Sequence, residues 1–427
     1  MRQGLRITTI RVRVVLITVL LVVMGVGVAY SYRENIVREL FSIPLIKQGM
    51  LEHTASGVVD TCKDAAYRPG CYEREIPLLM DNGLSMENAF IVTGLVQKKD
   101  PTYIYCHVLG HDISAKETAK DPSRWTSVMA QCPQGMCANG CLHGSVQQRF
   151  RNDSLTESEI SGMVPELVAT CEFGNGQTFT AVEQAVCYHG LGHLGMYATG
   201  GKVNQTLDMC DALASRAQNL GSKAAVKTRC YGATFMQIFQ FLDEEDRALV
   251  KDIAPKTREA ADRYCAQFAG EREAACHSES WPLSIEEIKT PEGAKVFCEY
   301  SSNPGYRQTC YNMVFASVTD FSNYNQSKIT SFCEELPSPR MAHCFARSAS
   351  RFIETSQRLG SEAVAMCKIA SSKGVGERCY KELLYFSTHN YHVGTDAFTK
   401  FCSLLPDPWK QKCLAGEGDT LPIVNDE

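Results

Sequence analysis

The sequence predicts an all-α protein: an α-solenoid of about ten disulfide-stapled helical hairpin repeats that follows an N-terminal transmembrane signal-anchor helix. Three observations predict this fold class. The cysteines recur at regular steps, turn residues cluster between paired cysteines, and an uncharged apolar run stands near the N-terminus. With 44% hydrophobic and 21% charged residues among 427, the composition is that of a folded chain.

One series of cysteines recurs at steps of 34 to 46 residues, and most members are followed by an aromatic residue, His or Leu. The series is Cys71, Cys106, Cys141, Cys187, Cys230, Cys276, Cys310, Cys344, Cys379 and Cys413. A second series precedes it: Cys62, Cys132, Cys171, Cys210, Cys265, Cys298, Cys333, Cys367 and Cys402. From Cys265 onward the two series are 11 to 12 residues apart in every unit. Such a fixed period is the signature of a repeat protein.

Proline and glycine lie between the two cysteines of a pair, in SSNPG, LPSPR, SSKGVG and LPDP, and such residues end helices. The 22 to 23 residues from one pair to the next have room for helix, turn and helix. In the last unit, residues 390–394 break a helix and Thr395 supplies an N-cap; Ser361 supplies a similar start signal one unit earlier. Each unit is therefore predicted to be an αα-hairpin, with its disulfide joining two helices.

The pairing rule also accounts for an irregular region. Cys106 has no partner upstream, whereas the third unit has three cysteines, Cys132, Cys137 and Cys141. We expect the leftover Cys106 and Cys137 to pair across neighbouring repeats, although the sequence alone leaves shuffled pairings open. The full expected set is 62–71, 106–137, 132–141, 171–187, 210–230, 265–276, 298–310, 333–344, 367–379 and 402–413. A disulfide that closes about a dozen residues stabilises the fold by about 3 kcal/mol.

The N-terminal residues predict the compartment. Four arginines, the last of them Arg13, flank the apolar run 14–30, which as a helix spans about 25 Å, near the lower limit for a bilayer. The positive flank predicts a single-pass protein with a cytoplasmic N-terminus and an extracytoplasmic bulk, in the periplasm, a lumen or outside the cell. A cleaved signal peptide is the alternative, but no small-x-small cleavage site is evident. Twenty cysteines without CxxC pairs independently favour disulfides and an oxidising compartment.

The expected organisation has six parts. They are a basic cytoplasmic tail at 1–13, the signal anchor at 14–30, a juxtamembrane linker or helix at 31–50, histidine-containing repeats with longer insertions at 51–260, regular Cys-x10-11-Cys repeats at 261–416 and a C-terminal tail at 417–427. The longer units follow Cys141, Cys187 and Cys230, and their extra residues are expected to form loops on one side.

Five of the ten histidines follow the second cysteine of three consecutive units: His107, His111, His143, His189 and His193. Residues four apart share a helix face, and equivalent positions of stacked hairpins are neighbours, so these imidazoles are expected to converge. Neutral imidazole is a good ligand for zinc, copper and iron, and the five histidines therefore predict a transition-metal site. Glycines among them predict that a helix, a ligand or a metal cluster approaches the backbone closely: Gly110, Gly144, Gly190, Gly192 and Gly195.

Three functions fit these features. The first is a membrane-anchored, extracytoplasmic metal-binding protein; the second is a scaffold that binds a protein partner on its solenoid surface, with structural histidines; the third is a metal-dependent enzyme. HExxH and CxxCH are absent, so no motif names a reaction. A packing role would not explain why the histidines stop after the fourth unit, where Gly232 and Met236 follow in the fifth. The net charge of -5 and the lack of basic runs with aromatics give no reason to expect nucleic acid, and the membrane contact is expected through residues 14–30.

Overall fold

The computed structural model describes residues 44–417, except 134, 151–154, 174–178, 219–222, 242, 243 and 302. Within these residues the protein is all-helical, with 22 α-helices, a few short 3-10 helices and no strand. The predicted signal anchor at 14–30 lies outside them. No helix in the part of the chain that the structure describes is both long and apolar enough to cross a membrane.

The helices fall into two sets according to the cysteine they carry. One set, the second-cysteine helices, contains the second cysteine of a unit or begins directly after it. Its members are α3 (Arg68–Asp81), α5 (His107–Lys120), α7 (Gly140–Phe150), α9 (Ala181–Ala198), α11 (Lys223–Phe239), α14 (Glu271–Glu279), α17 (Pro304–Phe321), α19 (Ser338–Thr355), α21 (Gly376–Asn390) and α23 (Trp409–Leu414). Each of these helices packs against the next member of the set, so a continuous wall runs along the chain.

The other set precedes the turn of each unit. It comprises α2 (Pro44–Cys62), α4 (Met86–Lys99), α6 (Trp125–Met129), α8 (Glu157–Phe173), α10 (Val203–Arg216), α13 (Arg258–Cys265), α16 (Pro291–Cys298), α18 (Gln326–Glu334), α20 (Gly360–Ser372) and α22 (Asp396–Cys402). Two further short helices belong to neither set: α12 (Glu244–Val250), in the long unit after Cys230, and α15 (Ile285–Ile288), in the regular unit after Cys276. The two sets together give the hairpins that the turn residues predict.

All ten expected disulfides are present, and none of the twenty cysteines is free. The irregular pair, Cys106–Cys137, links the start of α5 to the short turn before α7. Nearly all of the sulfurs belong to buried residues of three hydrophobic clusters, which extend over residues 51–141, 125–276 and 288–413. The disulfides are therefore part of the core and not surface clamps, and they indicate an oxidising, extracytoplasmic environment.

Of the two helix starts predicted from the sequence, one is confirmed and one is wrong. Thr395 caps α22, because its side chain accepts a hydrogen bond from the Phe398 backbone N–H. Ser361 was predicted to start the preceding helix, but α20 begins at Gly360 without a side-chain cap. The capping serine is Ser356, which starts a 3-10 turn that leads into α20. A 3-10 turn can satisfy the first backbone groups of a helix, so Ser361 has no capping role.

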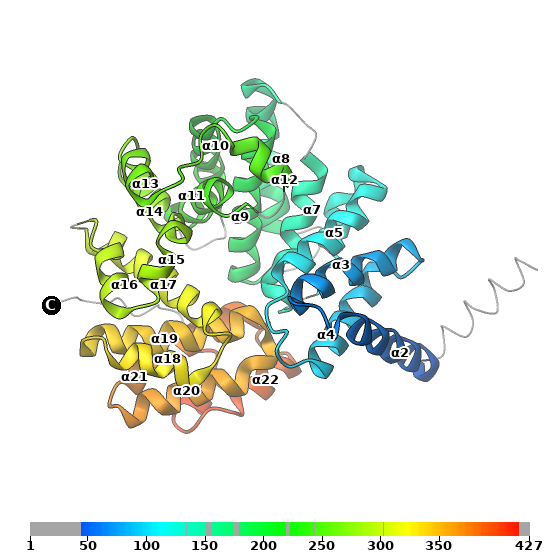
Figure 1. Ribbon diagram of the computed structural model, residues 1–427, viewed down its shortest axis with the longest axis vertical. Helices are drawn as coiled ribbons and strands as arrows, with labels where there is room; N and C mark the ends of the chain where they lie inside the picture. Colours follow the sequence, from blue (N-terminus) through cyan, green and yellow to red (C-terminus); the bar gives the residue numbers. More distant parts are fainter. Residues whose placement is uncertain are drawn as a thin grey trace, which may run out of the picture.

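The chain curves until its C-terminal helices lie beside its N-terminal helices (Figure 1), and α21 packs against α9. The turn between α19 and α20 forms the closing contacts. There the Gln357 backbone N–H donates to the Gly135 carbonyl at 3.2 Å, and the Arg358 guanidinium donates to the Gly94 carbonyl at 3.2 Å. The histidine-bearing helix α9 and the turn at 137–139 before α7 therefore contact elements from the other end of the chain.

Candidate metal centre

The five histidines come from three consecutive second-cysteine helices, with His107 and His111 on α5, His143 on α7, and His189 and His193 on α9. They form one continuous array, as expected. The ring centroids of neighbouring members lie 4.7 Å (107 to 111), 5.0 Å (111 to 143), 4.9 Å (143 to 189) and 5.0 Å (189 to 193) apart. Within the array, the nitrogens group into a triad and a pair.

Glycines allow the helices to approach closely enough for this array. A Cβ atom on Gly110 would lie 3.0 Å from the backbone nitrogen of Cys141, and one on Gly144 would collide with the backbone oxygen of His111. Gly192 faces α11 in the same way. The group that approaches these glycines closely is thus the backbone of the adjacent helix. The sequence alone allowed a helix, a ligand or a metal cluster there.

His107, His111 and His143 form the triad. The Nε2 atom of His111 lies 3.0 Å from Nε2 of His107 and 3.1 Å from Nδ1 of His143. All three nitrogens lie within 4.8 Å of one another, and all three residues are buried. This arrangement is a group that could hold a metal ion.

The outer nitrogen of each ring has an acceptor of its own. His107 Nδ1 faces the carbonyls of Cys137 and Ala138 at 3.3 and 3.2 Å, and His143 Nε2 faces the carbonyl of Val186 at 3.1 Å. Because a carbonyl can only accept, these two outer nitrogens carry the proton and donate it. The inner nitrogens of both rings are therefore left with lone pairs.

The third ring fits the same arrangement through Gln147. His111 Nδ1 lies 2.9 Å from the Gln147 side-chain oxygen, so this ring also donates outward and directs a lone pair inward. A neutral His111 could place a proton between the rings only if its tautomer changed and the Gln147 amide turned over. Even then one N–H would face two lone pairs, those of His107 and His143, whereas a metal ion could accept the lone pairs of all three rings.

The nitrogen separations agree with metal coordination. At a metal–nitrogen distance of about 2.05 Å, nitrogens 3.0 to 3.1 Å apart subtend an angle of about 95° at the ion. That angle lies between the octahedral value of about 90° and the tetrahedral value of about 109°. To seat one ion on all three rings, the inner nitrogens of His107 and His143, which lie within 4.8 Å of each other, must be no more than about 4.1 Å apart.

The electrostatic environment keeps the triad in its ligand form. His107, His111 and His143 are 8%, 5% and 4% exposed, and burial lowers the pKa of each, that of His107 to about 4. The positive charge of Arg351 lowers the pKa of His107 further. Because a metal ion binds the neutral ring and not imidazolium, the site is ready for an ion near neutral pH without a large proton release.

An unusual backbone segment positions the acceptors for His107. Cys137, Ala138 and Asn139 have φ angles of 51°, 46° and 59°, three consecutive non-glycine residues in the left-handed region. Such a conformation persists only where the surroundings fix it, and here the Cys106–Cys137 disulfide ties the segment to the start of α5. The result is that two carbonyls point at one imidazole, which is the outer-shell support common to metal-ligating histidines.

His189 and His193 form the pair. Their Nε2 atoms lie 3.3 Å apart, and His193 Nδ1 lies 2.7 Å from the side-chain oxygen of Gln237 on α11. His193 is buried, whereas His189 is half-buried. The pair lies beside the triad through the ring of His143 but is not part of it.

The sequence identified some of the supporting residues and missed others. Four residues near the histidines in the sequence are candidates to orient the rings or complete a shell: Asp112, Gln147, Glu183 and Tyr188. Gln147 orients a ring, but Tyr188 donates to Glu172 at 2.7 Å and Glu183 caps α9 through its contact with Thr180. The carbonyls at 137, 138 and 186 carry no signal in a sequence, because every residue has one. Gln237 could have been noticed in the sequence, because it directly follows Met236, the residue of the fifth unit that corresponds to His193.

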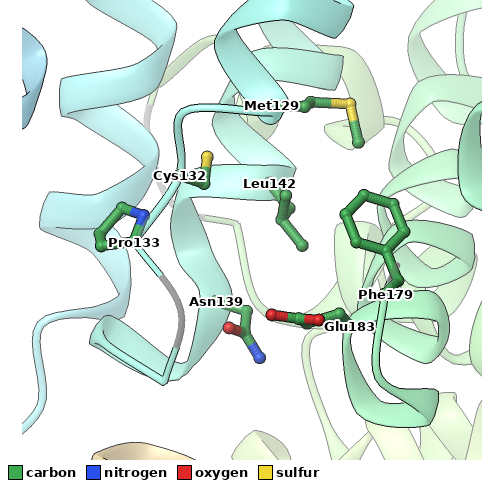
Figure 2. Close-up of a pocket in the computed structure, with 7 residues that line it drawn as sticks. All are labelled: Met129, Cys132, Pro133, Asn139, Leu142, Phe179 and Glu183. Carbon is green, nitrogen blue, oxygen red and sulfur yellow. The ribbon is translucent and has the colours of Figure 1, made fainter. Parts of the chain in front are cut away.

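A small pocket lies near the array but is not part of it. Its lining residues are Met129, Cys132, Pro133, Asn139, Leu142, Phe179 and Glu183 (Figure 2). None of the five histidines lines this pocket.

No protein-family model, curated protein or solved structure matches the chain.

Proposed function

We propose that the protein is a membrane-anchored, extracytoplasmic metal-binding protein whose ten hairpins form a solenoid, and that His107, His111 and His143 hold one transition-metal ion. The observation that carries the proposal is the convergence of three inner nitrogens whose rings all donate outward. The ten disulfides support the oxidising compartment, and the apolar run at 14–30 supports the anchor.

The ligand chemistry narrows the metal. Every cysteine is in a disulfide, so no thiolate is available, and the three inner atoms of the triad are all imidazole nitrogens. Imidazole suits zinc, copper and iron, and we propose one of these three for the triad. Magnesium and calcium prefer oxygen ligands and are disfavoured.

The ligand count keeps an enzyme as the second candidate. Three protein ligands leave an open coordination position, as is common in catalytic zinc sites. Against catalysis, the triad is buried, and no acidic residue belongs to its ligand set. We therefore favour metal binding, for storage or for delivery to a partner, over a reaction. A scaffold with incidental histidines is third, because packing alone does not require the lone pairs to converge.

The proposal is tested by elemental analysis of the full-length protein, purified in detergent without chelators and reloaded with Zn²⁺. We expect His111→Ala to remove one equivalent of metal. The matched control is His53→Ala, because His53 is exposed on α2 and outside the array, and this variant should keep the full metal content. A wild-type protein that retains no zinc, copper or iron after reloading would overturn the proposal.

A further inference from the structure

We propose that His189 and His193 hold a second metal ion, separate from the triad ion and more accessible to solvent. The proposal extends the proposed function from a one-ion site to a two-ion centre. It rests on that function for the identity of the neighbouring site, but its own geometry stands alone.

The pair repeats the architecture of the α5 half of the triad. On α5, His107 and His111 are four residues apart, and a glutamine of the next second-cysteine helix accepts from His111 Nδ1 at 2.9 Å. On α9, His189 and His193 are four residues apart, and Gln237 of the next second-cysteine helix lies 2.7 Å from His193 Nδ1. In both cases a glutamine oxygen fixes the proton on the outer nitrogen of the second histidine, so the inner Nε2 atoms of His111 and His193 present lone pairs.

The spacing of the two inner nitrogens fits one ion. At a metal–nitrogen distance of about 2.05 Å, nitrogens 3.3 Å apart subtend about 107° at the metal, close to the tetrahedral angle. Two histidines at i and i+4 on one helix present their nitrogens to the same side, as this geometry requires.

His143 separates this ion from the triad ion. Its Nδ1 atom faces the triad and its Nε2 atom faces the Val186 carbonyl, so neither nitrogen is free for the pair. The ring instead stacks on His189, with centroids 4.9 Å apart and planes at 23°. The five histidines therefore divide into three ligands and two ligands around one shared wall.

Charged groups on both sides of the pair shape its chemistry. The carboxylate of Asp246 on α12, itself 3% exposed, acts on His193, whereas the guanidinium of Arg229 on α11 acts on His189, as do the neighbouring imidazoles. The negative charge of Asp246 favours a bare cation at the pair, whereas the positive charge of Arg229 opposes it. An ion that carries an anionic ligand in its open positions suits both, and two protein ligands leave at least two such positions in a four-coordinate site.

Exposure distinguishes the two ions. The three triad residues are at most 8% exposed, whereas the pair combines a buried ligand, His193 at 3% exposed, with the half-buried His189, which gives the second ion one partly solvent-accessible ligand. We therefore expect the second ion to bind and leave faster than the first, the behaviour of an ion on its way into or out of a buried store.

The test is the number of metal ions per chain in the full-length protein, stripped with chelator in detergent, reloaded with Zn²⁺ and freed of excess. Wild type should hold two equivalents, His189→Gln/His193→Gln one, His107→Gln/His111→Gln one, and the His53→Gln control two. Chelator should remove zinc from wild type in two phases, and the pair variant should lack the fast phase. Disulfide content and circular dichroism check that each variant folds.

The outcomes separate the two proposals. One equivalent in wild type that survives in the pair variant would overturn the second site and leave the triad standing. One equivalent that is lost in both double variants would mean a single ion shared by all five histidines, which contradicts the division into two sites. No zinc in any form of the protein would contradict the triad as well. Should the pair variant fail to fold, Gln237→Met leaves both ligands in place and should accelerate the fast phase by about 10- to 100-fold; an unchanged rate would overturn the proposal.

Discussion

The N-terminal and C-terminal units use the same helix arrangement but fill it with different chemistry. On α17 and α19 charged residues are paired: Arg351 forms two hydrogen bonds with Asp320 at 3.0 and 2.7 Å, and Arg347 meets Glu354 at 2.7 Å. On α5, α7 and α9 the corresponding wall carries five imidazoles whose nitrogens face one another.

The comparison shows what the N-terminal array lacks. On α19 the guanidinium groups of Arg347 and Arg351 each have a carboxylate partner within the protein. In the array every ring donates outward to an acceptor wherever a contact is defined, and the inner nitrogens are left without positive charge between them. His343 on α19 shows the alternative: a single buried histidine whose Nε2 lies 2.6 Å from the side-chain oxygen of Asn312. One buried histidine needs no cation beside it, whereas the inner nitrogens of the triad converge on a point that could hold one.

The largest expected effect is on metal affinity. His111→Ala removes the central ligand of the triad and should lower the affinity of the triad for its ion by more than about 100-fold. That loss exceeds the usual loss for an outer-shell residue. Competition with a chromophoric chelator measures the change. The C-terminal control His343→Ala should leave the affinity unaltered, and an equal loss there would break the comparison.

Acid should destabilise the metal-free N-terminal units. The folded-state pKa of His107 is about 4, below its ordinary value of 6.5, so between these values the unfolded chain binds more protons than the folded chain. Stability should therefore fall as the pH is lowered from about 6.5 to about 4, by about 1.4 kcal/mol per pH unit for each histidine kept neutral. Urea unfolding of the chelator-treated protein at several pH values measures the slope.

The contrast with the C-terminal ion pairs fixes the sign. Although burial opposes its charge, the pKa of Glu354 is lowered by Arg347, so this pair keeps its contribution until the pH falls below the usual carboxylate range. Metal-free His107→Gln/His111→Gln protein should show a shallower slope than wild type. An unchanged slope would mean that these histidines do not carry the acid sensitivity.

Two disulfides distinguish stability from metal binding. Removal of either Cys333–Cys344 or Cys106–Cys137 by double Cys→Ser substitution should lower the free energy of unfolding by about 3 kcal/mol. Only removal of Cys106–Cys137 should also lower the affinity for the triad ion, because it releases the segment that directs two carbonyls at His107. Denaturant titration and metal competition on the same samples give both quantities, and equal metal affinities in the two variants would argue against this role of the segment.

A smaller effect is expected from Gln147→Leu. The substitution keeps all three ligands but removes the acceptor of His111 Nδ1, so the affinity for the triad ion should fall by about 10- to 100-fold. Gln147→Glu should bind at least as tightly as wild type, since a carboxylate accepts the same proton. A Leu variant with wild-type affinity would show that the ring orientation does not depend on Gln147.

The smallest expected effect is the loss of stability when a helix cap in the C-terminal region is removed. Thr395→Ala removes the side-chain acceptor at the start of α22 and should cost about 1 kcal/mol of stability. Thr395→Ser should retain most of it. Neither variant should alter metal content, and a change in metal content would show that the two regions are not independent.

Cysteine spacing predicted more of this structure than hydrophobic pattern did. The regular pairs, and even the cross-repeat Cys106–Cys137 pair, follow from counting partners, because a disulfide needs two cysteines and every cysteine is used. The convergence of the five histidines follows from the helical period together with the repeat. Both are periodic properties, and a periodic property can be read without a structure.

The remainder depends on non-local or backbone geometry. The left-handed residues 137–139 contain no glycine, so nothing in their sequence announces that their carbonyls turn toward His107. The closure of the chain at Arg358 and Gly94 joins residues 264 positions apart, and no local sequence pattern specifies such a contact. The division of the histidines into a triad and a pair likewise depends on which acceptor each ring meets.

X-ray absorption at the metal edge of the zinc-loaded, full-length protein tests the central claim most directly. The account predicts a first shell of nitrogen at about 2.0 to 2.1 Å with imidazole outer-shell scattering, and no sulfur at about 2.3 Å. Loss of the triad through His107→Gln/His111→Gln should reduce the imidazole signal per chain. A first shell of water oxygens alone, or a spectrum that the triad variant does not change, would contradict the assignment of these histidines as metal ligands.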